Sequence, residues 1–171
     1  MTSIADIKQQ ARDAATRMLE QLWEPGRFPV DPVPIANSLG IRVLFAKLPE
    51  GVSGAIHKTL DADPEIYIEA MESVPRRRFT CAHELGHFVL SQEKEVIEFV
   101  DYRDGANTPE EQFANAFAAN LLMPEDDVRA EAQRLGTNLM LSLWELWKRY
   151  GVSEHAMRVR LSTLGLIPSQ A

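Results

Sequence analysis

Apolar residues recur at helical spacing near the start of the chain and again throughout its second half. Between positions 3 and 23, isoleucine, alanine, methionine and leucine fall three or four residues apart, which predicts an amphipathic helix. Turn-forming Pro25-Gly26 ends this segment. A short helix is predicted over 33–39, and five further helices are predicted over residues 75–92, 108–123, 124–136, 139–150 and 153–164.

Shorter apolar stretches between these helices predict strands at 41–48, 51–58 and 65–69. Residues 93–107 are charged and have no clear period, so we predict a loop there. We consider residues 52–58 as an edge strand beside which an extended peptide could lie. An ordinary capped edge is an equal alternative for these residues.

These patterns predict an α+β fold, in which a small mixed or antiparallel sheet packs on the helix at 75–92 and a helical part follows. We expect one domain over residues 1–171. Its parts would be an N-terminal helix (1–27), a core (28–124) and a helical C-terminal subdomain (125–171) with a helix-turn-helix-like shape.

Composition narrows the class of protein. The 171 residues are 45% hydrophobic and 25% charged, which is enough for a core without disulfides. A net charge of −7 argues against a non-specific grip on nucleic acid. Cys81 is the single cysteine and is expected to be a small buried hydrophobe. We see no signal peptide or membrane-length apolar run, and therefore expect a cytoplasmic protein.

The strongest chemical signal is the run His83-Glu84-Leu85-Gly86-His87. On a helix, residues four apart lie on one face, so His83 and His87 can take adjacent corners of a tetrahedral zinc site. Glu84 adjoins the first ligand and would serve as the general base. The alternative is a chance pair of histidines, which we disfavour because apolar residues surround the run on a core-facing helix.

A catalytic zinc site needs a third protein ligand and an open position. Glu111 and Asn115 share a helix face, so Glu111 could bind zinc while Asn115 supports a ligand. Glu110 is the alternative ligand, although it lacks a polar partner four residues on. Either glutamate could instead be a solvated acid at a helix N-terminus.

Two segments together resemble the ImmA/IrrE metallopeptidases: Arg78-Phe-Thr-Cys-Ala-His-Glu-Leu-Gly-His-Phe-Val-Leu, and Glu111-Gln-Phe-Ala-Asn-Ala-Phe-Ala-Ala-Asn-Leu-Leu-Met-Pro124. The resemblance covers roughly residues 28–165. It implies a zincin-like fold, one zinc per chain on His83, His87 and Glu111, and Glu84 as the catalytic residue. It also implies helix-turn-helix repressors, often in stress-response systems, as substrates.

The chain departs from the pattern of that family at two positions. Family members often have a further histidine where this chain has Ser91. Many have an acid where this chain has Phe113, and its absence there strengthens Glu111 as the ligand.

The function we predict is therefore a zinc-dependent endopeptidase that cleaves a protein, with a helix-turn-helix repressor as the expected substrate. A donor to the oxyanion is also expected, with Tyr67, Tyr102 and His155 as weak candidates, because each is more simply a core or surface residue. His57 is expected at the surface.

The main alternative is a non-catalytic regulator of zincin shape that binds a transcription factor or DNA. Residues 143–164 resemble a helix-turn-helix, and Arg158 and Arg160 give its second helix some positive charge. Acidic residues and a continuous apolar seam in this region favour scaffolding or partner docking over DNA binding.

Overall fold

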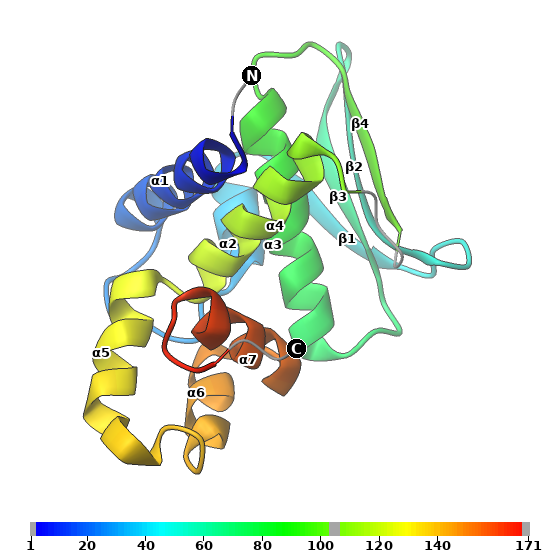
Figure 1. Ribbon diagram of the computed structural model, residues 1–171. Helices are drawn as coiled ribbons and strands as arrows, with labels where there is room; N and C mark the ends of the chain where they lie inside the picture. The colour runs from blue at the N-terminus through cyan, green and yellow to red at the C-terminus, as the bar shows by residue number, and fades with distance from the viewer. Residues whose placement is uncertain (1–2, 103–106, 169–171) are drawn as a thin grey trace.

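The chain folds into a mixed α+β structure, seen in a computed structural model that describes residues 3–102 and 107–168 (Figure 1). The elements follow the order α1 (Ile4–Leu22), α2 (Pro32–Ser38), β1 (Arg42–Ala46), β2 (Val52–Thr59), β3 (Ala62–Glu69), α3 (Val74–Ser91), β4 (Ile97–Tyr102), α4 (Pro109–Leu122), α5 (Glu125–Leu135), a 3₁₀ turn (Gly136–Asn138), α6 (Leu143–Tyr150) and α7 (Glu154–Thr163). The helices and the first three strands lie close to their predicted positions.

The sheet is mixed, with strand order β1-β3-β2-β4. β1 runs parallel to β3, while β2 is antiparallel to both β3 and β4. Two predictions are therefore wrong. Residues 93–107 contain the strand β4 instead of forming only a loop. Residues 52–58 lie inside the sheet, because β4 covers the side of β2 that we expected to be an edge.

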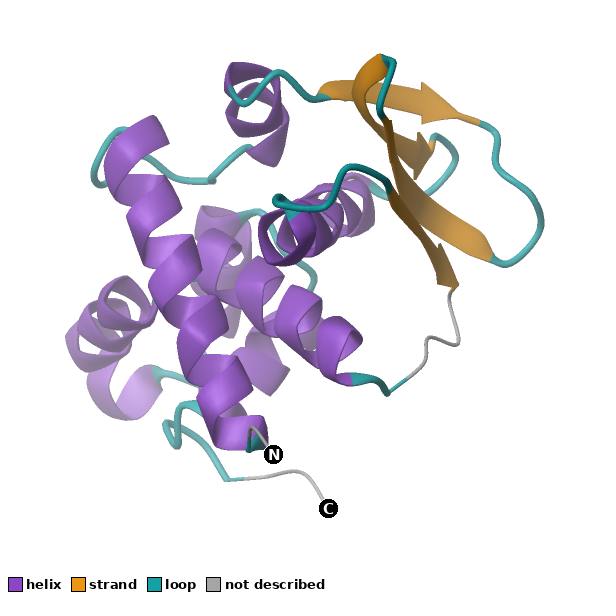
Figure 2. Ribbon diagram, turned by 90° about the horizontal axis from the view of Figure 1, so that it is seen from above, coloured by secondary structure: helices purple, strands orange, loops and turns teal. Residues whose placement is uncertain are grey.

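Helix α3 crosses one face of the sheet and α4 packs against the other side of α3, as seen from above in Figure 2. Small residues allow this close approach: a Cβ built on Gly86 of α3 would lie 2.8 Å from the Cα of Ala114. Since Gly86 has no side chain, the two helix backbones can come nearly into contact. Helix α1 covers a further side of α4.

The C-terminal helices are tied to the central pair by two arginines. Arg160 of α7 is only 6% exposed and donates hydrogen bonds to the carbonyl of Met123 (3.0 Å) and to Oδ1 of Asn120 (2.7 Å). Arg78 of α3 donates to the carbonyl of Gly151, 2.6 Å away. Arg160 is thus not available to phosphate, which removes part of the charge on which the DNA-binding alternative relied.

Across the residues described, no helix has both the length and the apolar character needed to cross a membrane.

Candidate metal centre

Three side chains from two helices converge beneath the sheet. His83 and His87 lie one turn apart on α3, and Glu111 projects toward them from the first turn of α4. The Nε2 atoms of the histidines are 3.1 Å apart. Oε2 of Glu111 lies 3.3 Å from Nε2 of His83, and its Oε1 lies 3.1 Å from Nε2 of His87. The three residues therefore present two nitrogens and a carboxylate to one point.

These separations fit a tetrahedral metal ion. Ligand atoms 2.0–2.1 Å from zinc at a tetrahedral angle are about 3.3 Å from one another. Only one hydrogen atom can lie between the two facing Nε2 atoms of the histidines. Without a metal ion, the two nitrogens and the carboxylate therefore cannot all have a hydrogen-bond partner at this point. A cation accepting both nitrogens and the carboxylate resolves this conflict. The donor set fits a catalytic zinc site, which has three protein ligands and an open position.

Contacts behind the ligands fix their orientation. Nδ1 of His83 donates to Oδ1 of Asn115, 3.1 Å away, which leaves the lone pair on Nε2 facing the centre. The ring of Phe99 stacks on His87 with centroids 4.3 Å apart. Burial, together with the neighbouring His83, lowers the pKa of His87 to about 4. His87 is therefore neutral at physiological pH, as a metal ligand must be.

The two glutamates at the start of α4 differ in their position relative to the histidines. Glu111 reaches both histidines, and its hydrogen bond and charge interaction with His83 hold its pKa below the usual range. Glu110 is exposed and lies outside the group of ligand atoms. Of the two candidates from the sequence, the structure therefore brings Glu111 to the histidines.

Glu84 is fully buried, and neither of its carboxylate oxygens has a hydrogen-bond partner among the described residues. Strand β2 passes directly over it at a glycine: a Cβ on Gly54 would lie 3.0 Å from Oε1 of Glu84 and 2.4 Å from the methyl of Thr80. Burial raises the pKa of Glu84 well above its usual value, and the charges of Asp101 and Glu111 raise it further. A buried carboxylate without partners is costly, which points to a functional reason for its presence.

Asp101 is a site residue that the sequence did not reveal. It lies near the end of β4, and its carboxylate falls within 4.8 Å of ligand atoms of His83 and Glu84. Burial raises its pKa. The signal was weak, since only the alternation of Ile97, Phe99 and Asp101 distinguishes this strand from a charged loop.

The other candidates from the sequence lie away from the ligands. Tyr67 hydrogen-bonds a carboxylate on its own strand and points to the opposite face of the sheet from the buried Ile66 and Ile68. Tyr102 is 57% exposed. His57 is exposed, and His155 lines a groove beside the centre.

The candidate metal centre and the fold together define a class of α+β protein in which two packed helices present side chains suited to a metal ion, and sequence similarity identifies its family. A sequence model of the IrrE N-terminal-like domain, Peptidase M78, matches residues 36–162. Because this match covers more than half of the chain, the protein belongs to that family.

One curated relative is the radiation response metalloprotease IrrE of Deinococcus radiodurans, 32% identical over 112 residues. The match covers 62% of this chain and 34% of the relative, so the chain corresponds to about a third of that protein. A solved structure, a Mycobacterium tuberculosis transcriptional regulator, superposes with a TM-score of 0.57 at 19% identity. It covers 92% of this chain and 47% of its own, and supports the fold alone.

Proposed function

We propose that this protein is a zinc-dependent endopeptidase in which His83, His87 and Glu111 hold one zinc ion and Glu84 is the general base. The observation that carries this proposal is the convergence of three ligand atoms beside the buried carboxylate of Glu84, which has no hydrogen-bond partner within the described part of the chain. Membership of a peptidase family and a curated relative named as a metalloprotease support it.

Zinc is the metal that the donor set favours. Two imidazoles and one carboxylate, with an open position, are a frequent ligand set of catalytic zinc in peptidases. Iron or manganese would also accept these ligands, so metal availability contributes to the choice.

In peptide hydrolysis the bound metal would supply Lewis acidity toward the scissile carbonyl and favour ionisation of water. Glu84 takes the proton from the attacking water and delivers it to the leaving amine. Burial raises the pKa of Glu84, which suits the second of these tasks because a carboxyl group with a raised pKa holds the transferred proton more readily. Asn115 keeps His83 in the tautomer that faces the centre.

A helix-turn-helix repressor is the substrate we propose, on the basis of the family resemblance of the segments at 78–90 and 111–124. Cleavage of such a repressor would place the protein in the cytoplasm and link it to transcriptional control, including responses to stress.

The test is metal content measured by elemental mass spectrometry on protein purified without chelator. We expect about one zinc per chain in the wild type and in Glu110→Ala, and a large loss in His83→Ala and Glu111→Ala. Glu110 is a matched control because it adjoins Glu111 but is exposed. A wild type that stays metal-free after zinc is added would contradict the proposal.

Catalysis is tested separately with Glu84→Gln. This variant should keep its zinc but no longer cleave a repressor encoded beside the peptidase. Undiminished cleavage would exclude Glu84 as the base. A zinc-loaded wild type that binds a repressor without cleaving it would instead favour the non-catalytic regulator.

A further inference from the structure

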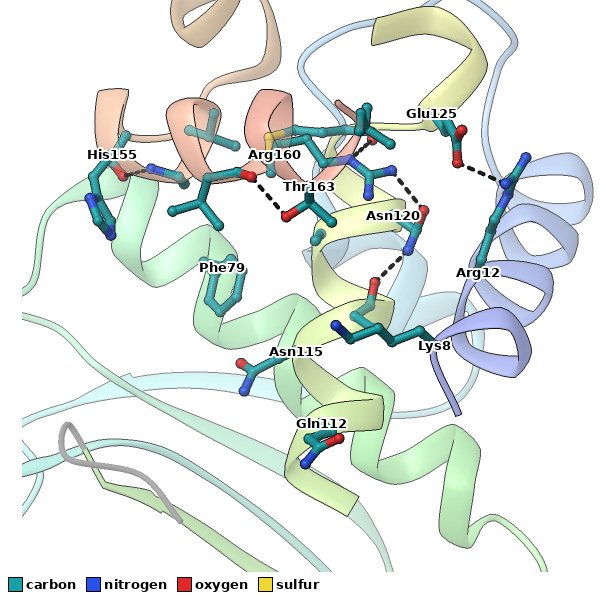
Figure 3. Close-up of a pocket in the computed structure, with 18 of the residues that line it drawn as sticks. Lys8, Arg12, Phe79, Gln112, Asn115, Asn120, Glu125, His155, Arg160 and Thr163 are labelled. Atoms are coloured by element: carbon teal, nitrogen blue, oxygen red, sulfur yellow. Dashed lines mark hydrogen bonds and ion pairs between the residues drawn. The ribbon is translucent and has the colours of Figure 1, made fainter. Parts of the chain in front are cut away.

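A large groove lies beside the metal centre, between α1, α4 and α7 (Figure 3). Its volume is about 910 Å³, near the upper end of the range for ligand pockets. Two of its lining residues connect it with the centre. Asn115 accepts the hydrogen bond from His83, and the ring of Phe79 lies 6.4 Å from that of His83. The groove therefore adjoins the ring of His83 on its Nδ1 side, and a peptide segment lying in it would pass close to the centre.

The charge of this groove is opposite to that of the whole protein. Among the residues that the structure describes, its lining includes five lysines and arginines but only one aspartate or glutamate. The five cations are Lys8, Arg12, Arg76, Arg129 and Arg160, and the acid is Glu125. Since the chain as a whole carries −7, the groove stands out as a local concentration of positive charge.

Internal ion pairs neutralise only part of this charge. Arg12 and Arg129 both contact Glu125, at 2.7 and 2.8 Å, and Arg12 also lies 3.9 Å from Asp126. Arg76 lies 3.6 Å from Glu72. Arg160 is buried and bonded to neutral oxygens of Met123 and Asn120, so its charge is not free to contact a partner directly. Lys8 is exposed and has no carboxylate partner within the described part of the chain. Among the described residues, Lys8 thus carries positive charge that an acidic partner can contact, and Arg12 and Arg129 share the single lining acid Glu125.

The groove also has apolar surface. Ile4 on α1 is 56% exposed and Val159 on α7 is 51% exposed, although both are large hydrophobic residues. Ala116 and Ala119 of α4 are half-buried and also line the groove. A partner that covers these residues would combine apolar with acidic side chains, as an amphipathic helix in a groove does.

We infer that the groove binds an acidic, amphipathic segment of the protein substrate and holds that substrate beside the metal centre. This inference rests on the proposed function. Helix α1, which provides Ile4, Lys8 and Arg12, precedes the residues 36–162 that match the family. One side of the groove is therefore formed by α1, which lies outside the region that matches the family, and the rest is formed mainly by residues within that region.

The experiment measures fluorescence anisotropy of a labelled 14-residue peptide in which leucine and glutamate are arranged at helical spacing. A second peptide has lysine in place of glutamate. The protein is the full chain, zinc-loaded and carrying Glu84→Gln so that no cleavage occurs. Lys8→Glu is compared with Arg17→Glu, which makes the same change of charge on α1 at an exposed position outside the groove.

We expect the glutamate peptide to bind, the lysine peptide not to bind, and added salt to weaken binding. Lys8→Glu should raise Kd by roughly threefold to tenfold, while Arg17→Glu should change it by less than about twofold. Equal effects of the two substitutions, or equal binding of both peptides, would overturn the inference.

Two further measurements address other occupants. A labelled DNA duplex that binds in place of the glutamate peptide, or a dimer in sedimentation that Lys8→Glu dissociates, would also overturn it. Zinc content is determined on each variant. Normal zinc content without peptide binding would contradict the inference about the groove but not the metallopeptidase proposal. Peptide binding by a protein that holds no zinc would contradict the metallopeptidase proposal but not the inference about the groove.

Discussion

Replacing Gly86 with alanine tests whether the close approach of α3 and α4 assembles the metal centre. The new Cβ would lie 2.8 Å from the Cα of Ala114, and ordinary carbon contacts begin at about 3.5 Å. The helices must therefore separate by about 0.7 Å. Overpacking of this kind costs about 1–3 kcal/mol, against which alanine gains about 1 kcal/mol of helix propensity over glycine. We expect a net loss of at most about 2 kcal/mol.

Zinc affinity should fall much more than stability does. Metal–ligand distances vary by about 0.2 Å, so a shift of about 0.7 Å between the helix of His83 and His87 and the helix of Glu111 breaks the geometry. We expect at least about tenfold weaker zinc binding in competition with a chelating dye. Thermal unfolding followed by circular dichroism should show a loss of about 2–4 °C for each kcal/mol.

Two comparison variants sharpen this experiment. Val128→Ala removes buried methyl groups from α5 and should cost roughly 1–3 kcal/mol without altering zinc affinity. Adding Ala114→Gly to Gly86→Ala should not restore zinc binding, because the nearest atom is the Ala114 Cα, which glycine retains. If Gly86→Ala binds zinc as tightly as the wild type, the close approach of the helices is not what positions the ligands.

Three further predictions concern single side chains. Asn115→Ala should weaken zinc binding by about 10–100-fold with little loss of stability, since Asn115 is exposed but orients a ligating histidine; unchanged affinity in dye competition would contradict this. Arg160→Met should lower the unfolding free energy in urea by about 1.5–3 kcal/mol through loss of its charge-assisted hydrogen bonds. Arg158→Met, which breaks only an exposed pair with Glu154, should cost less than about 0.5 kcal/mol, and equal losses would show that the buried contacts of Arg160 are unimportant. In the metal-free protein, burial raises the pKa of Glu84, so the folded state retains a proton that the unfolded chain releases above its ordinary pKa of about 4.5. Wild-type stability should therefore fall relative to Glu84→Gln as the pH rises from about 4.5, and a difference in melting temperature that stays constant with pH would refute this.

The placement of the candidate ligands on helix faces was predictable because it depends on local periodicity. A spacing of four residues places His83 above His87 on any helix, and the same spacing joins Glu111 to Asn115. The structure adds the contact between these two helices, which follows from small residues such as Gly86 and Ala114. Helix periodicity thus predicted which side chains share a face, the family resemblance strengthened the choice of Glu111 over Glu110, and the contact between the helices came from the structure.

Strand β4 was not predictable in the same way. Its six residues alternate only partly, and Val100 is exposed although apolar. The strand forms because β2 offers an unpaired edge, a condition set by residues about 45 positions earlier in the chain. Asp101 was missed for that reason, because its proximity to Glu84 depends on the register between β4 and β2.

In the C-terminal helices, tertiary contacts determine whether a positively charged side chain is available to a partner, and the sequence does not show those contacts. Arg160 gives the second helix of the helix-turn-helix-like segment some positive charge, yet its guanidinium donates hydrogen bonds to Met123 and Asn120 at the end of α4. Arg78 ties α3 to Gly151 in the turn before α7. The two helices that carry the ligands are therefore both anchored to the same C-terminal unit. Because the metal centre requires α3 and α4 to stay in fixed register, this unit supports the site without touching a ligand.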